Sequence, residues 1–300
     1  MSGARGRFAP SPTGPLHFGS LVAALASYCD ARASGREWLV RIEDVDEPRS
    51  RTDAERAILA ALTRYGLRWD GEIVRQSERT AIYESALDRL RGSGLVYACA
   101  CTRRDMDRAP MNASGERIYQ GTCRDGIPPP RAAAGHAAIR LRVGDAVVSY
   151  VDAVQGPQRQ DLAREVGDFI VRRADGLFAY QLAVVVDDAL QGVDSIVRGA
   201  DLLPSTPRQI HLQRCLDVAT PEYLHVPVAI NASGEKLSKQ TGAAALPDDP
   251  LPALLLAWRF LDQAMPPHAP QSAQAFMSYA IGAWSRTRLP PTVMLPAPRV

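Results

Sequence analysis

The sequence predicts an α/β protein built on a parallel sheet, because a strand, a helix and a second strand follow one another at its start. Residues 6–9 form a short apolar strand, residues 19–34 carry apolar side chains at helical spacing, and residues 38–42 form a second strand. A strand–helix–strand unit of this length predicts parallel strands joined by a right-handed crossover. The Pro-rich turn at 10–15 and Gly35 mark the helix ends. Open sheets bind ligands at the carboxyl ends of their strands, so we expect the site there.

The remaining elements follow from the same patterns of spacing and turn residues. Helices are expected at residues 53–65, 79–90, 206–216, 252–263 and 271–285. Strands are expected within 138–154, at 225–230, and on both sides of a hairpin turn at Asp175-Gly176, within 168–197. Residues 97–130 show little periodicity and contain a cysteine cluster with several Gly and Pro, which indicates an insert.

Composition limits the class of protein. The chain has 300 residues, of which 46% are hydrophobic and 23% charged, and its net charge is +2. So small a net charge does not indicate a nucleic-acid-binding protein, and an RNA partner would have to be met by local basic patches. The N-terminus lacks the apolar core of a signal peptide, and the apolar runs at 182–186 and 254–256 are too short to span a bilayer. We therefore expect a cytoplasmic protein without a membrane partner.

The first motif, RFAPSPTGPLHFGS at residues 7–20, joins the first strand to the first helix. Backbone N–H groups at a helix N-terminus favour an anion. His17 is placed to donate to phosphate oxygens, and Gly19 lets a nucleotide approach the backbone. Ser20 is the candidate cap of the helix. Taken alone, the motif is equally compatible with a Pro-rich loop of structural role.

The second motif, Lys236-Leu237-Ser238-Lys239-Gln240, lies in a polar loop after an apolar strand. Two lysines that flank a serine can neutralise the charge that develops on a polyphosphate during attack on the α-phosphorus. Taken alone, a solvated pair of surface charges is the alternative.

Three of the five cysteines, Cys99, Cys101 and Cys123, lie close together in the insert. An odd count with one tight cluster favours a metal over a disulfide framework, and three thiolates suit tetrahedral Zn²⁺. Tyr119 and His136 are both candidates for the fourth ligand. Reduced thiols in a loop are the alternative. The isolated Cys29 and Cys215 are expected to be core residues.

Together, the two motifs resemble the signatures of class I aminoacyl-tRNA synthetases, and their wording is similar to the glutamyl/glutaminyl branch. The segment Arg41-Ile42-Glu43-Asp44-Val45-Asp46 resembles that branch's R-x-E-D-T-D element, with Val45 in place of the usual threonine. Residues 186–188 and 197–209 also follow the family, although Ala200 replaces an acidic residue often seen there. The resemblance covers about residues 5–245.

The resemblance implies an enzyme that activates L-glutamate with ATP and Mg²⁺ to give glutamyl-adenylate and pyrophosphate. The positions that match the family's glutamate site are Arg7, Phe8, Ala9, Pro10, Ser11, Glu43, Tyr180 and Arg198. Arg7 and Arg198 would bind the two carboxylates, and Glu43 would hold the ammonium. A structural ion pair is the alternative for Glu43 and Arg198. The matching ATP positions are His17, Gly19, Ser20 and Lys239, and the catalytic ones are His17, Lys236 and Lys239.

The resemblance also implies the zinc ligands, the domain plan and the acceptor. A Cys-x-Cys…Tyr-x₃-Cys arrangement is similar to that of the family's zinc-bearing members, which favours Tyr119 for a structural zinc. The implied fold is a class I synthetase-type Rossmann-like parallel sheet split by a zinc-binding insert. Its segments are the first catalytic half at 1–96, the insert at 97–137, the second half at 138–247 and a short helical region at 248–300.

Only about sixty residues follow the second motif, too few for an anticodon-binding domain of the usual kind. This profile resembles the glutamyl-Q tRNA(Asp) synthetases, which place glutamate on the queuosine base of tRNA(Asp). The resemblance implies a monomer. The alternatives are a minimal glutamyl-tRNA synthetase that charges a 3′ end, a non-catalytic RNA-binding paralogue, and a ligase without an RNA partner.

Overall fold

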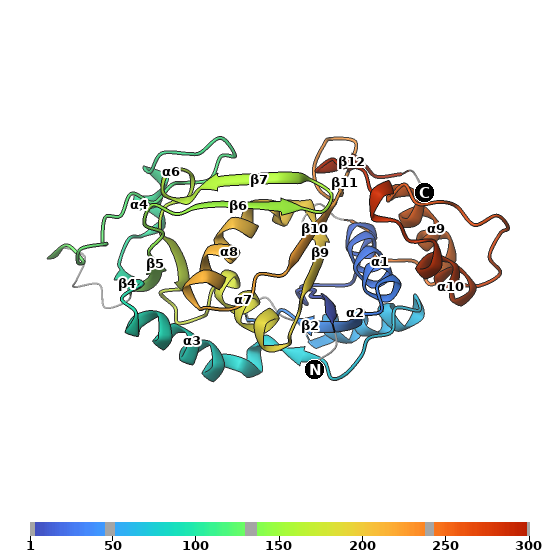
Figure 1. The fold of residues 1–300 in the computed structure, drawn as a ribbon, viewed down its shortest axis with the longest axis horizontal. Coiled ribbons are helices and arrows are strands. Elements are labelled where there is room, and N and C mark those ends of the chain that lie inside the picture. The colour runs from blue at the N-terminus through green and yellow to red at the C-terminus, as the bar shows by residue number, and fades with distance from the viewer. Residues whose placement is uncertain (1–3, 46–51, 130–136, 238–242, 299–300) are drawn as a thin grey trace.

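The computed structural model describes residues 4–45, 52–129, 137–237 and 243–298. Five parallel strands form the main sheet in the order β10-β9-β1-β2-β3 (Figure 1). The bounds of these strands are Glu222–Val226 (β10), Ser195–Gly199 (β9), Arg5–Phe8 (β1), Glu37–Ile42 (β2) and Val74–Arg75 (β3). The predicted parallel α/β fold and its opening strand–helix–strand unit are confirmed.

Successive side chains along each strand point to opposite faces of the sheet, and this alternation divides the core into two clusters, one on each face. On one face, Trp38 and Val40 pack with α1 (Phe18–Ala33) and α2 (Thr52–Arg64). Leu39 and Ile196 face the other way and pack with α3 (Thr80–Gly92), α7 (Tyr180–Leu190) and α8 (Thr206–Cys215). The same alternation places Arg7, Arg41 and Arg198 on the α7 face.

The segment that contains the cysteines lies at one end of the elongated molecule, opposite the C-terminal helices (Figure 1). It is bounded by β4 (Val96–Cys99) and β5 (Ala138–Leu141), which pair antiparallel with each other, and β5 also pairs with β8 (Phe169–Arg172). The short helices α4 (Arg103–Asp107) and α6 (Leu162–Glu165) lie in the same region, and β6 (Val147–Asp152) and β7 (Gly156–Asp161) form a hairpin beside it.

The C-terminal helices α9 (Pro250–Phe260) and α10 (Ala273–Ala283) pack against α1 through Trp258, Phe276 and their neighbours. The predicted helices at 252–263 and 271–285 are thus confirmed within a few residues. The predicted strand at 225–230 is divided at Pro227 into β10 and β11 (Val228–Ile230), and β11 pairs instead with β12 (Met294–Pro296). Proline has no N–H to continue a ladder, which explains the break.

One predicted element is wrong. The run after Asp175-Gly176 was expected to form the second strand of a hairpin, but Tyr180–Leu190 is the helix α7. β8 before the turn is a strand, and only an isolated bridge joins Arg172 to Phe178 after it. Seven successive residues of α7, from Leu182 to Asp188, are buried, and such a run does not distinguish a strand from a buried helix. Among the described helices, none is long and apolar enough to cross a membrane.

Candidate active site

A cavity of about 660 Å³ lies at the carboxyl ends of β1, β9 and β10, beside the N-terminus of α1. This is the edge at which an open parallel sheet binds ligands. Its wall contains every residue predicted for glutamate, together with all but one of those predicted for ATP and catalysis: Arg7, Phe8, Ala9, Pro10, Ser11, Glu43, Tyr180, Arg198, His17, Gly19, Ser20 and Lys236. The exception, Lys239, lies outside the described residues.

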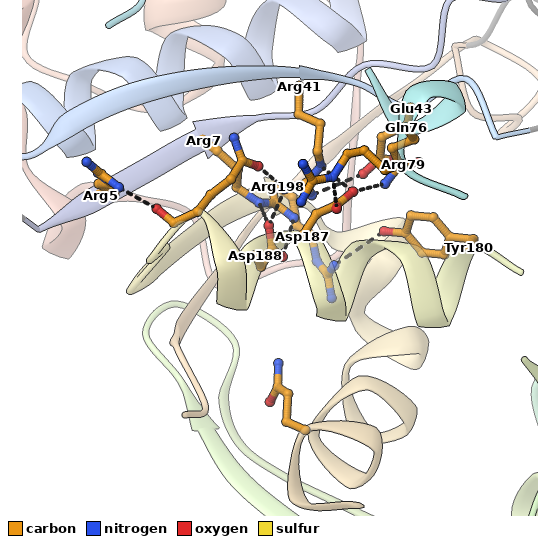
Figure 2. A network of polar contacts seen from close by, with 12 residues as sticks. Arg5, Arg7, Arg41, Glu43, Gln76, Arg79, Tyr180, Asp187, Asp188 and Arg198 are labelled. Carbon is orange, nitrogen blue, oxygen red and sulfur yellow. Dashed lines mark hydrogen bonds and ion pairs between the residues drawn. The ribbon is translucent and has the colours of Figure 1, made fainter. Parts of the chain in front are cut away.

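Arg7 enters the cavity wall from β1 and is held by Asp188 of α7 (Figure 2). Its Nε donates to Oδ1 at 3.1 Å and its Nη2 to Oδ2 at 3.3 Å. Both side chains are buried. Burial alone would raise the pKa of Asp188, but Arg41 and Arg7 hold it below its usual value. Two parallel bonds to a carboxylate fix the plane of the Arg7 guanidinium.

Arg41 lies at the centre of the same network and is fully buried (Figure 2). Its Nη1 donates to Asp188 at 2.8 Å, its Nη2 donates to Glu43 at 3.4 Å, and Asp187 lies 3.7 Å from its Nε. Burial raises the pKa of Glu43, although Arg41 and Arg7 oppose that shift. Glu43 therefore has both an ion pair with Arg41 and a place in the cavity wall.

Asp187 connects this network to the segment before α3. It accepts hydrogen bonds from Gln76 Nε2 at 2.9 Å, from Arg79 Nε at 2.6 Å and from Tyr83 OH at 2.7 Å. Its side chain is fully buried, so these bonds satisfy a carboxylate that water does not reach. The wall behind Arg7 and Glu43 is thus joined rigidly to α3 and α7.

Arg198 reaches the cavity from β9, with the Tyr180 hydroxyl beside its guanidinium (Figure 2). Its Nη1 lies 3.5 Å from Tyr180 OH, and its Nη2 donates to Thr206 Oγ1 at 2.9 Å. Its Nε donates to Nε2 of His225 at 3.0 Å. The cavity wall thus contains two buried arginines, Arg7 from β1 and Arg198 from the neighbouring strand β9, together with Glu43.

The N-terminus of α1 borders the same cavity. His17 is the N-cap: its Nδ1 accepts from the Ser20 N–H at 3.4 Å, and Ser20 Oγ accepts from the His17 N–H at 2.7 Å. A Cβ at Gly19 would lie 3.3 Å from the His17 ring and 3.4 Å from Leu237 O, so the absence of a side chain at Gly19 allows these groups to approach closely. The N-cap is thus His17 and not Ser20 as expected; Ser20 is the third helical residue, completes the capping box with its side chain, and also lines the cavity.

Lys236 lines the cavity from the second motif and pairs with Asp201, which follows β9. Phe8 lines it as well, while its ring stacks on Trp38 at a centroid distance of 6.1 Å. Ser238, Lys239 and Gln240 lie outside the described residues.

The cysteine cluster forms a second candidate site, beside β4. The sulfurs of Cys99, Cys101 and Cys123 all lie within 4.8 Å of one another, and those of Cys101 and Cys123 are 3.7 Å apart. Zn–S bonds of about 2.3 Å put two sulfurs of a tetrahedron about 3.8 Å apart, so the spacing fits. Tyr119 OH lies 3.4 Å from Cys99 Sγ and 4.0 Å from Cys101 Sγ. These three cysteines could hold a metal ion.

Arg140 adds positive charge to this cluster. Its Nε donates to Cys99 Sγ at 3.2 Å, and its guanidinium lies 3.8 Å from the centre of the Tyr119 ring. Burial would raise the pKa of the Cys99 thiol, but hydrogen bonding with Tyr119, the Cys101 backbone and Arg140 outweighs it and lowers that pKa. His136, the other candidate for fourth ligand, lies outside the described residues. The isolated Cys29 is fully buried, as expected, and Cys215 is partly buried.

Several residues of the site were not predicted from the sequence. Asp187 and Asp188 were noted as part of a motif but given no role, and Arg79, Asp152 and His225 were not noted as site residues. Their partners lie far away along the chain: 181 positions separate Arg7 from Asp188, and 73 separate Asp152 from His225. A single sequence contains no signal for such pairs. The one available hint was the acidic pair Asp187-Asp188 at the end of an apolar run, because buried carboxylates must be paired with opposite charges.

Comparison with known proteins identifies the family of the chain. The family model described as "tRNA synthetases class I (E and Q), catalytic domain" matches residues 4–249. A protein of Thiobacillus denitrificans named glutamyl-Q tRNA(Asp) synthetase is 53% identical over 298 residues, which cover 98% of each chain. One of that name from Burkholderia cenocepacia is 56% identical over 293 residues, covering 95% of this chain and 97% of the relative.

Solved structures share the fold. Glutamate-tRNA synthetase from Elizabethkingia anophelis superposes with a TM-score of 0.80 at 24% identity, over 97% of this chain and 67% of that one. A glutamate tRNA ligase from Elizabethkingia meningosepticum, solved with its amino acid, gives 0.78 at 23% identity, over 97% of this chain and 66% of that one. Because the family match covers residues 4–249 and the full-length relatives are 53–56% identical, the chain belongs to the class I tRNA synthetases for E and Q, within the group named glutamyl-Q tRNA(Asp) synthetases.

Proposed function

We propose that this protein activates L-glutamate with ATP and transfers the glutamyl group to the queuosine base in the anticodon of tRNA(Asp). The names of the relatives support the acceptor, and the cavity supports the amino acid. The observation that carries the proposal is a pair of buried arginines, Arg7 and Arg198, in one cavity wall together with the acid Glu43. Glutamate carries two carboxylates and one ammonium, and this arrangement complements all three.

Each side chain has a physical reason for its role. Arg7 and Arg198 are positioned to form charge-assisted bonds to the carboxylates, and Glu43 to accept from the ammonium. The Tyr180 hydroxyl lies beside Arg198 and adds a further polar contact. Glutamine should be rejected, because its amide would leave a buried guanidinium without a compensating charge.

The first step is attack of the glutamate α-carboxylate on the α-phosphorus of ATP, which forms the acyl-adenylate and releases pyrophosphate. Positioning and charge neutralisation supply most of the rate in such a transfer. We assign ATP to the N-terminus of α1, with His17, Gly19 and Ser20, and to Lys236 and Lys239 of the second motif. Mg²⁺ bound with ATP would supply further charge on the phosphate oxygens.

In the second step, a hydroxyl of the queuosine cyclopentene ring attacks the carbonyl carbon of the adenylate, and AMP leaves. ATP and tRNA as substrates favour the cytoplasm as the site of this reaction, and we propose that the protein acts as a monomer. The insert of residues 97–137 is assigned to the side of the protein that approaches the RNA.

We further propose that Cys99, Cys101, Tyr119 and Cys123 hold one structural Zn²⁺. The support is the approach of the three sulfurs to within 4.8 Å of one another, with the tyrosine oxygen next to two of them. Bound zinc would fix the fold of the segment between β4 and β5.

The test of activation is exchange of labelled pyrophosphate into ATP, with queuosine-bearing tRNA(Asp) present. Exchange should depend on glutamate and fail with glutamine. Replacing Arg198 by alanine should lower kcat/KM for glutamate by roughly 30- to 4000-fold, because removing one partner of a buried charge pair costs about 2–5 kcal/mol. Arg91→Ala, on the exposed face of α3, is the matched control and should change nothing. Equal exchange with glutamine would overturn the proposal.

A further inference from the structure

Two buried side chains stand behind Arg198, on the side away from the cavity. His225 is the neighbour of Arg198 in the register between β10 and β9, so both side chains lie on the same face of the sheet. Asp152 ends β6, and the next residue's N–H donates to the Tyr223 carbonyl at 2.9 Å, which ties the hairpin to β10. The side chains of His225 and Asp152 are fully buried. Neither residue lines the cavity.

The three side chains form a chain of hydrogen bonds with a fixed direction. An arginine Nε always carries a hydrogen, so at 3.0 Å the Nε2 of His225 must accept from Arg198. The other ring nitrogen, Nδ1, then carries the proton and donates to Asp152 Oδ2 at 2.6 Å. His225 is therefore neutral and in its Nδ1–H tautomer.

The two oxygens of Asp152 have different partners. Oδ1 accepts the backbone N–H groups of Val154, Gln155 and His225, at 3.0, 2.8 and 3.2 Å. Oδ2 accepts from the His225 ring. Burial would raise the pKa of Asp152, but these hydrogen bonds outweigh it and lower the pKa, so the carboxylate stays ionised. Burial lowers the pKa of His225, which keeps the ring neutral.

We propose that Asp152 and His225 are positioning residues that fix the glutamate specificity of the enzyme by holding the Arg198 guanidinium in one orientation. The hydrogen-bonded pair of His225 and Asp152, called the relay below, accepts from Nε of Arg198, and Thr206 Oγ1 accepts from Nη2 at 2.9 Å. Nη1, whose contact with Tyr180 is 3.5 Å long, is left as the donor directed at the substrate carboxylate. The inference rests on the proposed function, because it assumes that Arg198 binds glutamate.

Asp152→Asn is the sharpest test, because the backbone dictates how the amide must lie. The amide oxygen has to take the place of Oδ1, where three N–H groups need an acceptor, and the NH₂ then faces Nδ1. That nitrogen must accept, so Nε2 becomes protonated. Its hydrogen then meets the Nε–H of Arg198 at 3.0 Å and, at 3.3 Å, the Thr206 hydroxyl, which already accepts from Nη2 of Arg198. The repulsion should turn the guanidinium away from its present orientation.

We expect Asp152→Asn to raise KM for glutamate at least about tenfold in pyrophosphate exchange, with KM for ATP unchanged within about twofold, since a buried donor loses its acceptor. Asp30→Asn is the control: it is also a buried carboxylate paired with an arginine, Arg286, but lies in the last turn of α1, away from His17. It should lower stability without changing KM for glutamate. An unchanged KM in Asp152→Asn, or an equal rise in the Asp30→Asn control, would overturn the proposal.

A double-mutant cycle separates positioning from general damage. Lysine at position 198 has no Nε–H to orient, so adding Asp152→Asn to Arg198→Lys should change KM for glutamate by less than about twofold. Multiplicative effects would refute the relay. Should Asp152→Asn fail to fold, His225→Gln and His225→Leu replace it: the glutamine retains an acceptor and should bind glutamate more tightly than the leucine, and equal KM values would count against the proposal.

The ring tautomer provides a readout that is independent of catalysis. In ¹⁵N NMR of histidine-labelled protein, His225 should show the Nδ1–H form in the wild type and the Nε2–H form in Asp152→Asn. An Nε2–H form in the wild type would overturn the relay. If the wild type shows the expected tautomer but no glutamate-dependent exchange, the proposed function fails and the relay stands only as a structural feature.

Discussion

Replacing Asp188 by alanine would leave two buried guanidinium groups without the carboxylate that they share. Asp188 accepts from Arg7 at 3.1 and 3.3 Å and from Arg41 at 2.8 Å. The side chains of Asp188 and Arg7 are 5% and 4% exposed, and that of Arg41 is fully buried. Water therefore cannot readily replace the lost carboxylate, and both arginines lose a buried counter-charge.

The expected loss of stability is about 3–5 kcal/mol, the usual cost of removing one partner from a buried ion pair. Glu43 and Asp187 still lie near Arg41, at 3.4 and 3.7 Å, which limits the loss for that arginine. Among the described residues, no second carboxylate lies within 4.0 Å of the Arg7 guanidinium. At about 2–4 °C per kcal/mol, the melting temperature should fall by roughly 6–20 °C.

The assay is urea unfolding followed by circular dichroism, with a thermal melt beside it. Asp194→Ala is the matched control, since that aspartate pairs with Arg36 at 3.0 Å but is 48% exposed. It should cost under about 1 kcal/mol, as exposed pairs do. A loss below about 1 kcal/mol for Asp188→Ala would refute the view that the network behind the cavity compensates buried charge.

Three further perturbations test other parts of the structure. Gly167→Ala should destabilise the protein by more than about 1 kcal/mol in urea unfolding, because φ is +74° and the new Cβ would lie 2.2 Å from a Tyr119 oxygen. The free energy of unfolding should fall as pH drops below about 6.5, because burial lowers the pKa of both His211 and His225, so that only the unfolded chain takes up their protons. The expected slope is up to about 1.4 kcal/mol per pH unit for each histidine. Urea unfolding at pH 7.5 and 5.5 measures it. Cys123→Ser should abolish the one equivalent of zinc expected from metal analysis of the purified protein.

The glycine and cysteine substitutions each have a control within the chain. Gly176 has a similar positive φ of +91° with nothing within 4 Å, so Gly176→Ala isolates strain from collision and should cost less than Gly167→Ala. Equal stability at the two pH values would contradict neutral buried histidines. Cys215 lies outside the cluster, so the Cys215→Ser protein should retain its one equivalent of zinc. Zinc retained in the Cys123→Ser protein would exclude Cys123 as a ligand.

The elements predicted best were those whose local pattern agrees with the tertiary structure. The first strand, helix and strand formed where alternation, helical spacing and Gly35 indicated them. The helix at 206–216 and the two C-terminal helices were also found within a few residues. In these segments apolar spacing and end signals point to the same structure, so a single sequence was sufficient.

α7 shows where sequence reasoning fails. Its run of Leu182, Ala183 and three valines suits a strand by propensity, but it forms a buried helix that packs against α3 and α8. Burial on nearly all sides removes the amphipathic period by which a helix is usually recognised. Tertiary packing overrode propensity there, and the error also hid the partner of Arg7, because Asp188 lies on this helix.

The motifs predicted the residues that line the candidate site, but they did not predict the residues that hold those side chains in place. The residues that line the cavity stand in short motifs with a known chemical logic, such as Arg7 and His17. The residues that hold them, Asp188 and His225 among them, contribute buried hydrogen bonds from distant segments of the chain. Only the fold brings these pairs together, so the sequence alone does not indicate their roles.

The central claim concerns the acceptor, and labelled glutamate tests it most directly. The protein would be incubated with ATP and labelled glutamate, together with tRNA(Asp) that bears queuosine, tRNA(Asp) that lacks it, or tRNA(Glu). The proposed function predicts label on the queuosine-bearing tRNA(Asp) alone. Label on tRNA(Glu), or equal label on both forms of tRNA(Asp), would contradict it and would indicate a minimal synthetase that charges a 3′ end.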